Sequence, residues 1–365
     1  MAKIDSITIK GFKSIACIED LKLGAINVII GANGSGKSNF IGVFSFLHAI
    51  IEMRLDEYVR QAGGAEKVLF FGAKVTQELS ITINSQKPYG IKLQATNNDQ
   101  LMMKPESSSF YFISGIRDIK YYVNGRVSVN DDQRFISEQE YSDKFRGQID
   151  NWRVYHFHDA GTTSPMKKTA DVDDNRYLRA DGANIAAFLY LLREKHLESY
   201  KMIRRSVQLV APFFDDFMLE PQALNPNKIR LEWKHKKSDA YFDASSLSDG
   251  TLRFIALATL FLQPESTRPS VILVDEPELG LHPYAITIFA SMVKEAAVNS
   301  QVILSTQSPQ LLDNFEPEDV LVANQVDGAT EITRLHPERL ALWLEDYSLG
   351  QLWEKNELGG RPGGE

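Results

Sequence analysis

One segment constrains the fold of this chain more than any other: Gly31-Ala32-Asn33-Gly34-Ser35-Gly36-Lys37-Ser38. It fits the pattern G-x-x-x-x-G-K-[ST] without a mismatch, and it joins an apolar, strand-like run to a helix-like stretch that begins at Asn39. In that setting the loop backbone turns its N–H groups toward a polyphosphate, and the dipole of the following helix favours the same anion. The segment therefore predicts a nucleotide-binding P-loop in an α/β fold.

Specific roles follow from this pattern. Lys37 is expected to reach the β- and γ-phosphates of ATP, and the Ser38 hydroxyl is expected to hold Mg²⁺. The residues expected to contact the nucleotide are Gly31, Asn33, Gly34, Ser35, Gly36, Lys37, Ser38 and Asn39.

A second motif, far downstream, supplies the carboxylates that a P-loop needs. The run 271–274 is apolar and rich in β-branched residues, which is typical of a strand buried on both faces of a parallel sheet, and it ends in Asp275 and Glu276. Two adjacent carboxylates at a buried strand end are costly unless a cation neutralises them. We therefore expect Asp275 to bind Mg²⁺ as a Walker B aspartate does, and Glu276 to orient or deprotonate the attacking water. A solvated acidic turn is the alternative interpretation.

A third motif lies shortly before the second. Residues 246–254 open an apolar segment long enough for a helix, with Ser248 as a good N-cap. By itself this pattern indicates only a capped helix start. Between the other two motifs it resembles the L-S-G-G-Q signature of ABC-type ATPases, in the form Leu247-Ser248-Asp249-Gly250-Thr251. The resemblance implies that the signature of one subunit contacts the γ-phosphate held by the other, so that a homodimer encloses two ATP molecules. A higher oligomer is left as an alternative.

The apolar run 301–304 and the polar residues after it resemble the switch strand of ABC-type ATPases. That strand usually ends in His, whereas this chain has Gln307. A neutral amide can sense a γ-phosphate through hydrogen bonds, but it cannot carry the charge of a proton. We therefore expect Gln307 to act beside Glu276 and Lys37 in slow hydrolysis. Two alternatives stay open: a non-catalytic ATP sensor and, less favoured, the nucleotide-binding subunit of a transporter.

The opening segment 7–14 resembles the first strand of SMC-type and RecF-type ATPases, which implies that Lys13 and Ser14 border the nucleotide. More broadly, the chain resembles the compact SMC/RecF-like predicted AAA ATPases of bacteria, a group related to the ATPase part of OLD-family nucleases. The stretches that carry this narrower resemblance are 181–189, 211–217 and 349–356. It implies an α/β fold: an ABC-type P-loop ATPase head with a mixed central sheet, a flanking antiparallel β-subdomain and a compact helical insert.

The same resemblance implies an ATPase that works with a separately encoded nuclease or other effector in anti-phage defence or DNA repair. OLD-type proteins carry a Toprim nuclease after the ATPase part, and the residues that follow the switch strand here are too few for one. Any nuclease is therefore expected on a partner protein. Direct contact with DNA stays open, because a net charge of −8 argues against a broadly basic surface while the basic turn 234–237 is a local candidate.

Cysteine content and hydropathy indicate the compartment. Cys17 is the one cysteine of the chain, so no internal disulfide can form, which suits a reducing cytosol. Its strand-like surroundings predict a buried thiol. No apolar stretch reaches the ~18 residues that a membrane-spanning helix needs. We therefore expect a cytoplasmic protein without membrane contact.

Four parts are expected along the chain. An N-terminal ATPase lobe, 1–130, would hold the P-loop and an antiparallel β-subdomain with an Asn124-Gly125 hairpin. A lid-like helical and loop insert, 131–240, would precede a C-terminal ATPase lobe, 241–350, and a tail, 351–365. The insert shows no long heptad pattern, so a compact structure is predicted there rather than a coiled-coil rod.

Overall fold

The computed structural model describes residues 3–85, 89–103, 122–123, 126–129, 134–137, 149 and 151–359. The chain divides into two compact units: unit 1 is Met1–Arg153 with Glu316–Glu365, and unit 2 is Val154–Phe315. Unit 1 therefore contains both ends of the chain, and unit 2 is one continuous segment. The four-part organisation expected from the sequence stays a prediction, and the two units are described separately.

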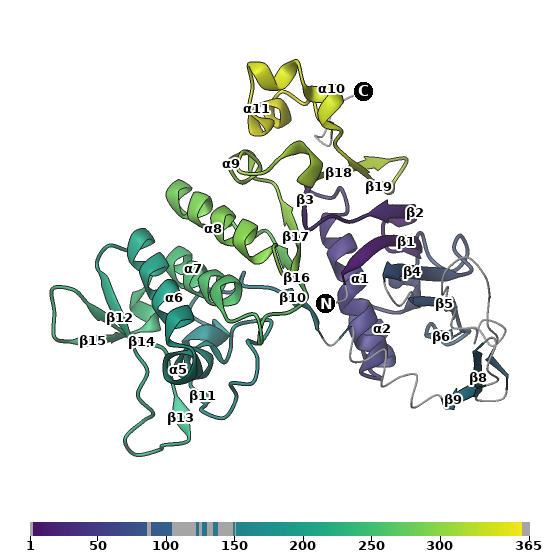
Figure 1. The fold of residues 1–365 in the computed structure, drawn as a ribbon. Helices are drawn as coiled ribbons and strands as arrows, with labels where there is room; N and C mark the ends of the chain where they lie inside the picture. Colours follow the sequence, from purple (N-terminus) through teal and green to yellow (C-terminus); the bar gives the residue numbers. More distant parts are fainter. Residues whose placement is uncertain are drawn as a thin grey trace. The chain divides into compact units, whose positions relative to one another are not determined.

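Unit 1 contains an antiparallel sheet in the strand order β2-β1-β4-β5-β6 (Figure 1). Its strands are β1 (Ile4–Phe12), β2 (Ile15–Lys22), β4 (Leu79–Ser85), β5 (Tyr89–Ala95) and β6 (Leu101–Met103). Apolar residues alternate along β4 and β5 because one face of the sheet is packed and the other is not. This sheet is the antiparallel β-subdomain that the sequence predicts.

The expectation of a buried thiol at Cys17 is wrong, because its side chain is exposed. Cys17 lies on β2 at the edge of this sheet, opposite Lys10 of β1. The buried positions of β2 are Ile15, Ile18 and Leu21, three residues apart rather than two, and Cys17 is one of the exposed residues between them.

A second sheet of unit 1 is mixed and carries the P-loop strand. β3 (Ile26–Ile30) runs parallel to β18 (Val320–Val326), which pairs antiparallel with β19 (Ala329–Arg334). Every residue of β3 is buried, as expected for a strand covered on both faces. The remaining described strands of unit 1 form a small antiparallel sheet: β7 (Tyr122–Val123), β8 (Arg126–Val129) and β9 (Arg134–Ser137). The predicted Asn124-Gly125 turn lies outside the described residues, between β7 and β8, which pair antiparallel.

The helix that follows the P-loop is packed in the core of unit 1. It is apolar on most of its surface, and its large side chains Phe40, Phe44 and Leu47 are fully buried. The ring of Phe44 meets Trp152 edge-on, with 6.3 Å between ring centroids. The described helices of unit 1 are α1 (Lys37–Ile51), α2 (Leu55–Ala62), α3 (Ala65–Val68), α10 (Pro337–Leu340) and α11 (Leu349–Glu354), with 3₁₀ turns η4 (Pro317–Asp319) and η5 (Trp343–Glu345).

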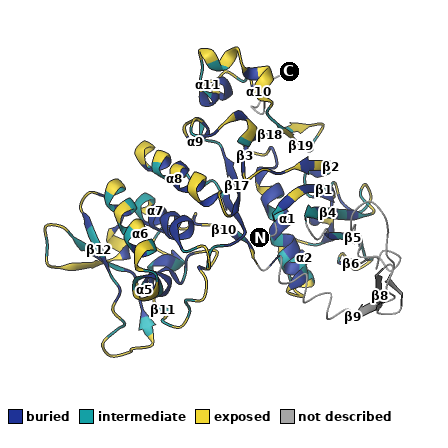
Figure 2. Cartoon of the chain, viewed as in Figure 1, coloured by how far each residue is buried: buried dark blue, intermediate teal, exposed yellow. Residues whose placement is uncertain are grey.

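Unit 2 is organised around two parallel strands, β16 (Val271–Asp275) and β17 (Gln301–Thr306). Both strands are almost wholly buried, and the helices α7 (Asp249–Leu262) and α8 (Pro283–Ala296) pack against each other beside them. Figure 2 shows α8 with one buried and one exposed face, which is the pattern of an amphipathic covering helix. Because β16 and β17 are parallel, their carboxyl ends meet at one edge, where Asp275 lies opposite Ser305.

The remaining elements lie before and after these strands. β10 (Trp152–Tyr155) spans the division between the units. Those within unit 2 are η2 (Pro165–Lys167), β11 (Ala170–Asp171), α5 (Ile185–Lys195), α6 (Leu197–Val210), β12 (Phe214–Met218), β13 (Lys228–Ile229), β14 (Glu232–His235), β15 (Tyr241–Asp243), η3 (Ala244–Ser246) and α9 (Pro309–Leu312). Within the described ranges, no helix has the length and apolar character to cross a membrane.

Candidate nucleotide-binding site

Gly36 determines the shape of the P-loop where it enters α1. Its φ of 98° lies in the left-handed region, which favours glycine. A Cβ added here would lie 1.9 Å from Oγ1 of Thr330 on β19. Conformation and packing therefore both exclude a side chain. The buried Thr330 is a wall of the loop that sequence reasoning missed, because nothing in the pattern of β19 distinguishes this residue.

The amino end of α1 is open to an anion. No side chain caps this end, and its first turn contains no acidic residue. The first-turn N–H groups of any helix lack intrahelical partners and attract negative charge. The buried hydroxyl of Ser35 has no hydrogen-bond partner among the described residues, so it is a spare donor beside the same turn. These features fit a polyphosphate, as the sequence predicts.

Lys37 is buried at the base of the loop. Its Nζ donates hydrogen bonds to the carbonyl oxygens of Gly31, at 2.7 Å, and Ala32, at 2.9 Å. A buried ammonium needs such acceptors, and phosphate oxygens can replace carbonyl oxygens in that role. The neighbouring Ser38, whose hydroxyl is predicted to hold Mg²⁺, is exposed.

The structure brings together Ser14 and Asn39, two of the residues predicted to contact the nucleotide. Asn39 Nδ2 donates to Ser14 Oγ at 2.7 Å, and the same hydroxyl lies 2.7 Å from Thr330 Oγ1. Lys13 lies next to them in the left-handed region, with a φ of 49°. Burial lowers the pKa of Lys13, and its ammonium lies 5.5 Å from the centroid of the Phe12 ring.

In unit 2, side chains hold the two candidate carboxylates in place. Asp275 accepts a hydrogen bond from the Ser305 hydroxyl, and Glu276 accepts one from the side-chain amide of Gln307. Glu276 has a φ of 41°, which is left-handed and costs a non-glycine residue on the order of 1–3 kcal/mol. Backbone strain of this kind is concentrated at functional sites. The structure thus joins Glu276 and Gln307, which sequence reasoning placed in one reaction.

Glu278 belongs to this cluster, although the sequence prediction did not include it. Its Oε1 accepts hydrogen bonds from Thr306 Oγ1, at 2.5 Å, and from the Gln307 backbone N–H, at 3.2 Å. Its Oε2 is buried without a partner among the described residues. Burial raises the pKa of Glu278, which favours the neutral carboxylic acid. The one signal in the sequence was its position two residues after Glu276.

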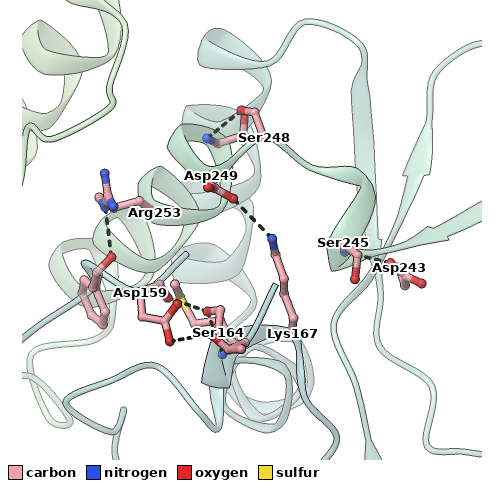
Figure 3. A network of polar contacts seen from close by, with 12 residues as sticks. Asp159, Ser164, Lys167, Asp243, Ser245, Ser248, Asp249 and Arg253 are labelled. Atoms are coloured by element: carbon pink, nitrogen blue, oxygen red, sulfur yellow. Dashed lines mark hydrogen bonds and ion pairs between the residues drawn. The ribbon is translucent and has the colours of Figure 1, made fainter. Parts of the chain in front are cut away.

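The signature residues begin α7, and Ser248 is its N-cap as expected. Ser248 Oγ accepts a hydrogen bond of 3.1 Å from the Thr251 N–H (Figure 3). Ser248 and Asp249 are exposed, whereas Leu247 is buried. A Cβ on Gly250 would lie 2.3 Å from the carbonyl oxygen of Gly280. Glycine is therefore required at position 250 because the start of α7 packs directly on the loop that follows Glu276.

Each set of site residues is assembled within its own unit. The P-loop with Lys13, Ser14 and Asn39 belongs to unit 1, and the carboxylates, Gln307 and the signature belong to unit 2. Across the described residues, no group of three or more His, Cys, Asp or Glu side chains is arranged to hold a metal ion. Mg²⁺ usually takes one or two protein ligands together with phosphate oxygens and water. Ser38 and Asp275 as its ligands stay a prediction.

Comparison with known proteins identifies the family of this chain. The family described as "AAA domain, putative AbiEii toxin, Type IV TA system" matches residues 26–313. No curated protein matches the chain.

Among solved structures, the chain resembles SMC head domains. A head bound to the C-terminal winged-helix domain of ScpA is 18% identical, covers 93% of this chain and 99% of its own, and gives a TM-score of 0.59. A Pyrococcus furiosus head with an extended coiled coil, bound to the C-terminal domain of ScpA, is 16% identical, with coverages of 95% and 99% and a TM-score of 0.59. A Pyrococcus yayanosii head with a coiled coil and joint is 13% identical, with coverages of 95% and 99% and a TM-score of 0.54. At these identities the likeness shows the fold, and it confirms the predicted ABC-type ATPase head.

Proposed function

The chain belongs to the AAA-domain family whose model matches residues 26–313, and from this membership we propose that it binds Mg-ATP on the P-loop and hydrolyses it slowly. The observation that carries the proposal is the open amino end of α1. Gly36 has the left-handed φ, no side chain caps the helix, and Lys37 is buried beside the Ser35 hydroxyl. This arrangement offers backbone donors, a hydroxyl and an ammonium to one polyphosphate.

The proposed roles follow from the chemistry of each group. Lys37 would donate to the β- and γ-phosphate oxygens, while Ser38 and Asp275 would hold Mg²⁺, whose charge would neutralise that of the phosphates. Glu276 orients or deprotonates the attacking water. The side-chain amide of Gln307 holds the Glu276 carboxylate in place by a hydrogen bond. The groups proposed to surround the nucleotide on the P-loop side are Gly31, Asn33, Gly34, Ser35, Gly36, Asn39, Lys13 and Ser14.

We further propose that two copies close around ATP, each presenting Leu247–Thr251 to the nucleotide held by the other. The exposure of Ser248 and Asp249 supports this proposal, because residues that contact a second copy must be accessible in the first. Two of the SMC heads were solved with a domain of ScpA bound. By analogy we propose a separately encoded effector, such as a nuclease, in anti-phage defence or DNA repair.

One observation favours a second candidate, an ATP sensor whose occupancy rather than turnover controls the partner. The Gln307 amide already donates a hydrogen bond to one carboxylate oxygen of Glu276. An amide cannot itself take up a proton from water. A sensor and a slow ATPase differ in whether partner control survives the loss of the catalytic carboxylate.

Substitution of Glu276 by Gln tests the proposal. The Glu276→Gln variant is expected to lose hydrolysis by about 100-fold or more, the usual effect of removing a general base, while keeping ATP affinity. It should accumulate as a dimer with ATP and Mg²⁺ in sedimentation experiments and return to monomer with ADP. Lys37→Ala is the control, since it should neither bind ATP nor dimerise. A Glu276→Gln protein that binds ATP yet stays monomeric would refute the two-copy mechanism, and partner control that persists in it would favour the sensor.

A further inference from the structure

Lys167 lies beside the signature, although no signature pattern includes it. It ends the 3₁₀ turn η2, and its side chain is only 8% exposed. Its Nζ lies 3.3 Å from Oδ1 of Asp249, whose own side chain is 61% exposed. Figure 3 shows the lysine extending from the turn to the start of α7. The aliphatic stem of Lys167 is thus buried while its ammonium reaches the exposed first turn of the signature helix.

The main chain that carries Lys167 is fixed by its own hydrogen bonds. Ser164 is fully buried, donates to the carbonyl oxygen of Asp159 at 2.6 Å and accepts from the Met166 N–H at 3.3 Å. The Lys167 N–H donates to the Ser164 carbonyl at 3.1 Å. The lysine is therefore presented from a rigid turn rather than from a loose loop.

A second clamp ties the same segment to the signature helix. Arg253 lies four residues after Asp249, on the same face of α7. Its guanidinium donates to the carbonyl oxygens of Phe157, at 2.9 Å, and His158, at 2.8 Å. The segment 157–167 is thus joined to α7 at two places, by Arg253 and by the Lys167–Asp249 pair. The ammonium of Lys167 is thus held beside the first turn of the signature helix.

Stability alone does not explain the pair. One partner is well exposed to water, and ion pairs of this kind contribute little because solvent screens them and both side chains lose freedom. The position of Asp249 raises a separate problem. If the signature meets a triphosphate, a carboxylate in its first turn repels that anion, and the repulsion must be offset by a nearby cation.

We propose that Lys167 is a phosphate-binding residue supplied in trans: its ammonium donates to the γ-phosphate of the ATP held on the P-loop of the other copy. An ammonium has three N–H donors, so Lys167 can keep Asp249 and bind a phosphate oxygen at the same time. Asp249 then serves to aim the lysine. This inference rests on the proposed two-copy function and adds to it a residue that lies outside the motif.

The test uses dimerisation of the full chain with ATP and Mg²⁺ in the Glu276→Gln background, followed by sedimentation. Lys167→Gln is expected to raise the dimer dissociation constant by about tenfold or more, the effect of losing one charge-assisted hydrogen bond. Asp249→Asn removes the repulsion and keeps an amide oxygen that can accept from Lys167, so its dimer should be as tight as that of the parent or tighter. The double variant should dimerise about tenfold more weakly than Asp249→Asn, because the phosphate contact of Lys167 is lost in that background too. Lys168→Gln, at the exposed neighbouring lysine, is the matched control and should behave like the parent.

Each other outcome overturns the inference in its own way. A double variant that dimerises as tightly as Asp249→Asn would mean that Lys167 only neutralises Asp249 and does not reach a phosphate. An unchanged dimer in Lys167→Gln would remove any role at the interface. Binding of a fluorescent ATP analogue to each monomer, together with its unfolding temperature, separates these results from loss of the P-loop site or of the fold. A parent that never dimerises would refute the two-copy function, and this inference would fall with it.

Discussion

The phosphate loop of unit 1 and the carboxylate cluster of unit 2 are built in opposite ways. The loop is shaped by backbone, with Gly36 packed against Thr330 and a helix end that no side chain closes. The cluster is shaped by side chains that hold one another, as Gln307 holds Glu276. An atom added where the loop is packed, as at Gly36, should therefore distort the loop whatever its charge. A change of chemistry at constant shape should leave the cluster folded and impair what it does.

The largest effect is expected from Gly36→Ala. The new Cβ would lie 1.9 Å from Thr330 Oγ1, and the residue would keep a φ of 98°. The left-handed conformation alone costs an alanine ~1–2 kcal/mol, and overlap in a packed site adds ~1–3 kcal/mol. ATP affinity should fall by about 100-fold or more, since each 1.4 kcal/mol is a factor of about ten. Titration with a fluorescent ATP analogue measures this loss.

Gly34→Ala is the matched control for that prediction. Gly34 has a φ of +82°, but a Cβ there would meet no atom within 4 Å. Gly34→Ala should therefore incur only the cost of the left-handed backbone conformation, and its ATP affinity should fall about tenfold. Equal losses in the two variants would show that overlap with Thr330 does not matter, and the contrast between the loop and the cluster would then lose its main support.

A smaller effect is expected from Gln307→Leu, which tests the other side of the comparison. Leucine is close to glutamine in size but cannot donate to the Glu276 carboxylate. A hydrogen bond to a charged group contributes about 1.5–3 kcal/mol, so kcat should fall by roughly 10- to 100-fold with little change in ATP affinity. Steady-state hydrolysis and ATP titration measure the two quantities.

Gln310→Leu makes the same substitution at the exposed Gln310 on α9 and should change neither quantity. If Gln307→Leu instead weakened ATP binding and left kcat unchanged, Gln307 would contact the γ-phosphate rather than position Glu276. That result would favour the sensor over the slow ATPase.

The sequence predicted much of this architecture because several motifs occur at a fixed position in a strand or helix, so that the motif also marks where the element begins or ends. The P-loop and the run ending at Asp275 were found where a strand ends, and Ser248 was found at the start of a helix. Thr330, Glu278 and Lys167 were missed, because each contributes through a contact made in three dimensions. Thr330 is 294 residues from Gly36, and Lys167 is 82 residues from Asp249, so no local pattern relates them.

Cys17 shows a different limit of the sequence analysis. A small apolar residue in a strand-like stretch predicts burial, but β2 is an edge strand whose buried residues are Ile15, Ile18 and Leu21, and Cys17 between them is exposed. Which residues are exposed depends on how β2 pairs with β1. The register of that pair shifts at a β-bulge or similar irregularity between Ile7 and Ile9 of β1. Composition and periodicity do not contain that information.

The smallest effect is expected from Glu278→Gln, and it should appear in how the free energy of unfolding depends on pH. Burial raises the pKa of Glu278 above its ordinary value of 4.5, so the folded protein binds this proton more tightly than the unfolded chain does. Its contribution to stability is full below pH 4.5 and is lost as pH rises through the raised pKa. Over that window the free energy of unfolding should fall by up to ~1.4 kcal/mol per pH unit in the wild type.

Glutamine copies the neutral acid, because its carbonyl can accept from Thr306 and Gln307 while its amide takes the place of Oε2. Glu278→Gln should therefore remove this part of the pH slope and be the more stable protein at the alkaline side of the window, as measured by urea unfolding at several pH values. Glu338→Gln, at the exposed Glu338 on α10, should leave the slope unchanged. A wild-type slope that Glu278→Gln does not alter would mean that Glu278 is ionised in the fold. The cluster would then need a cation beside it even in the absence of nucleotide.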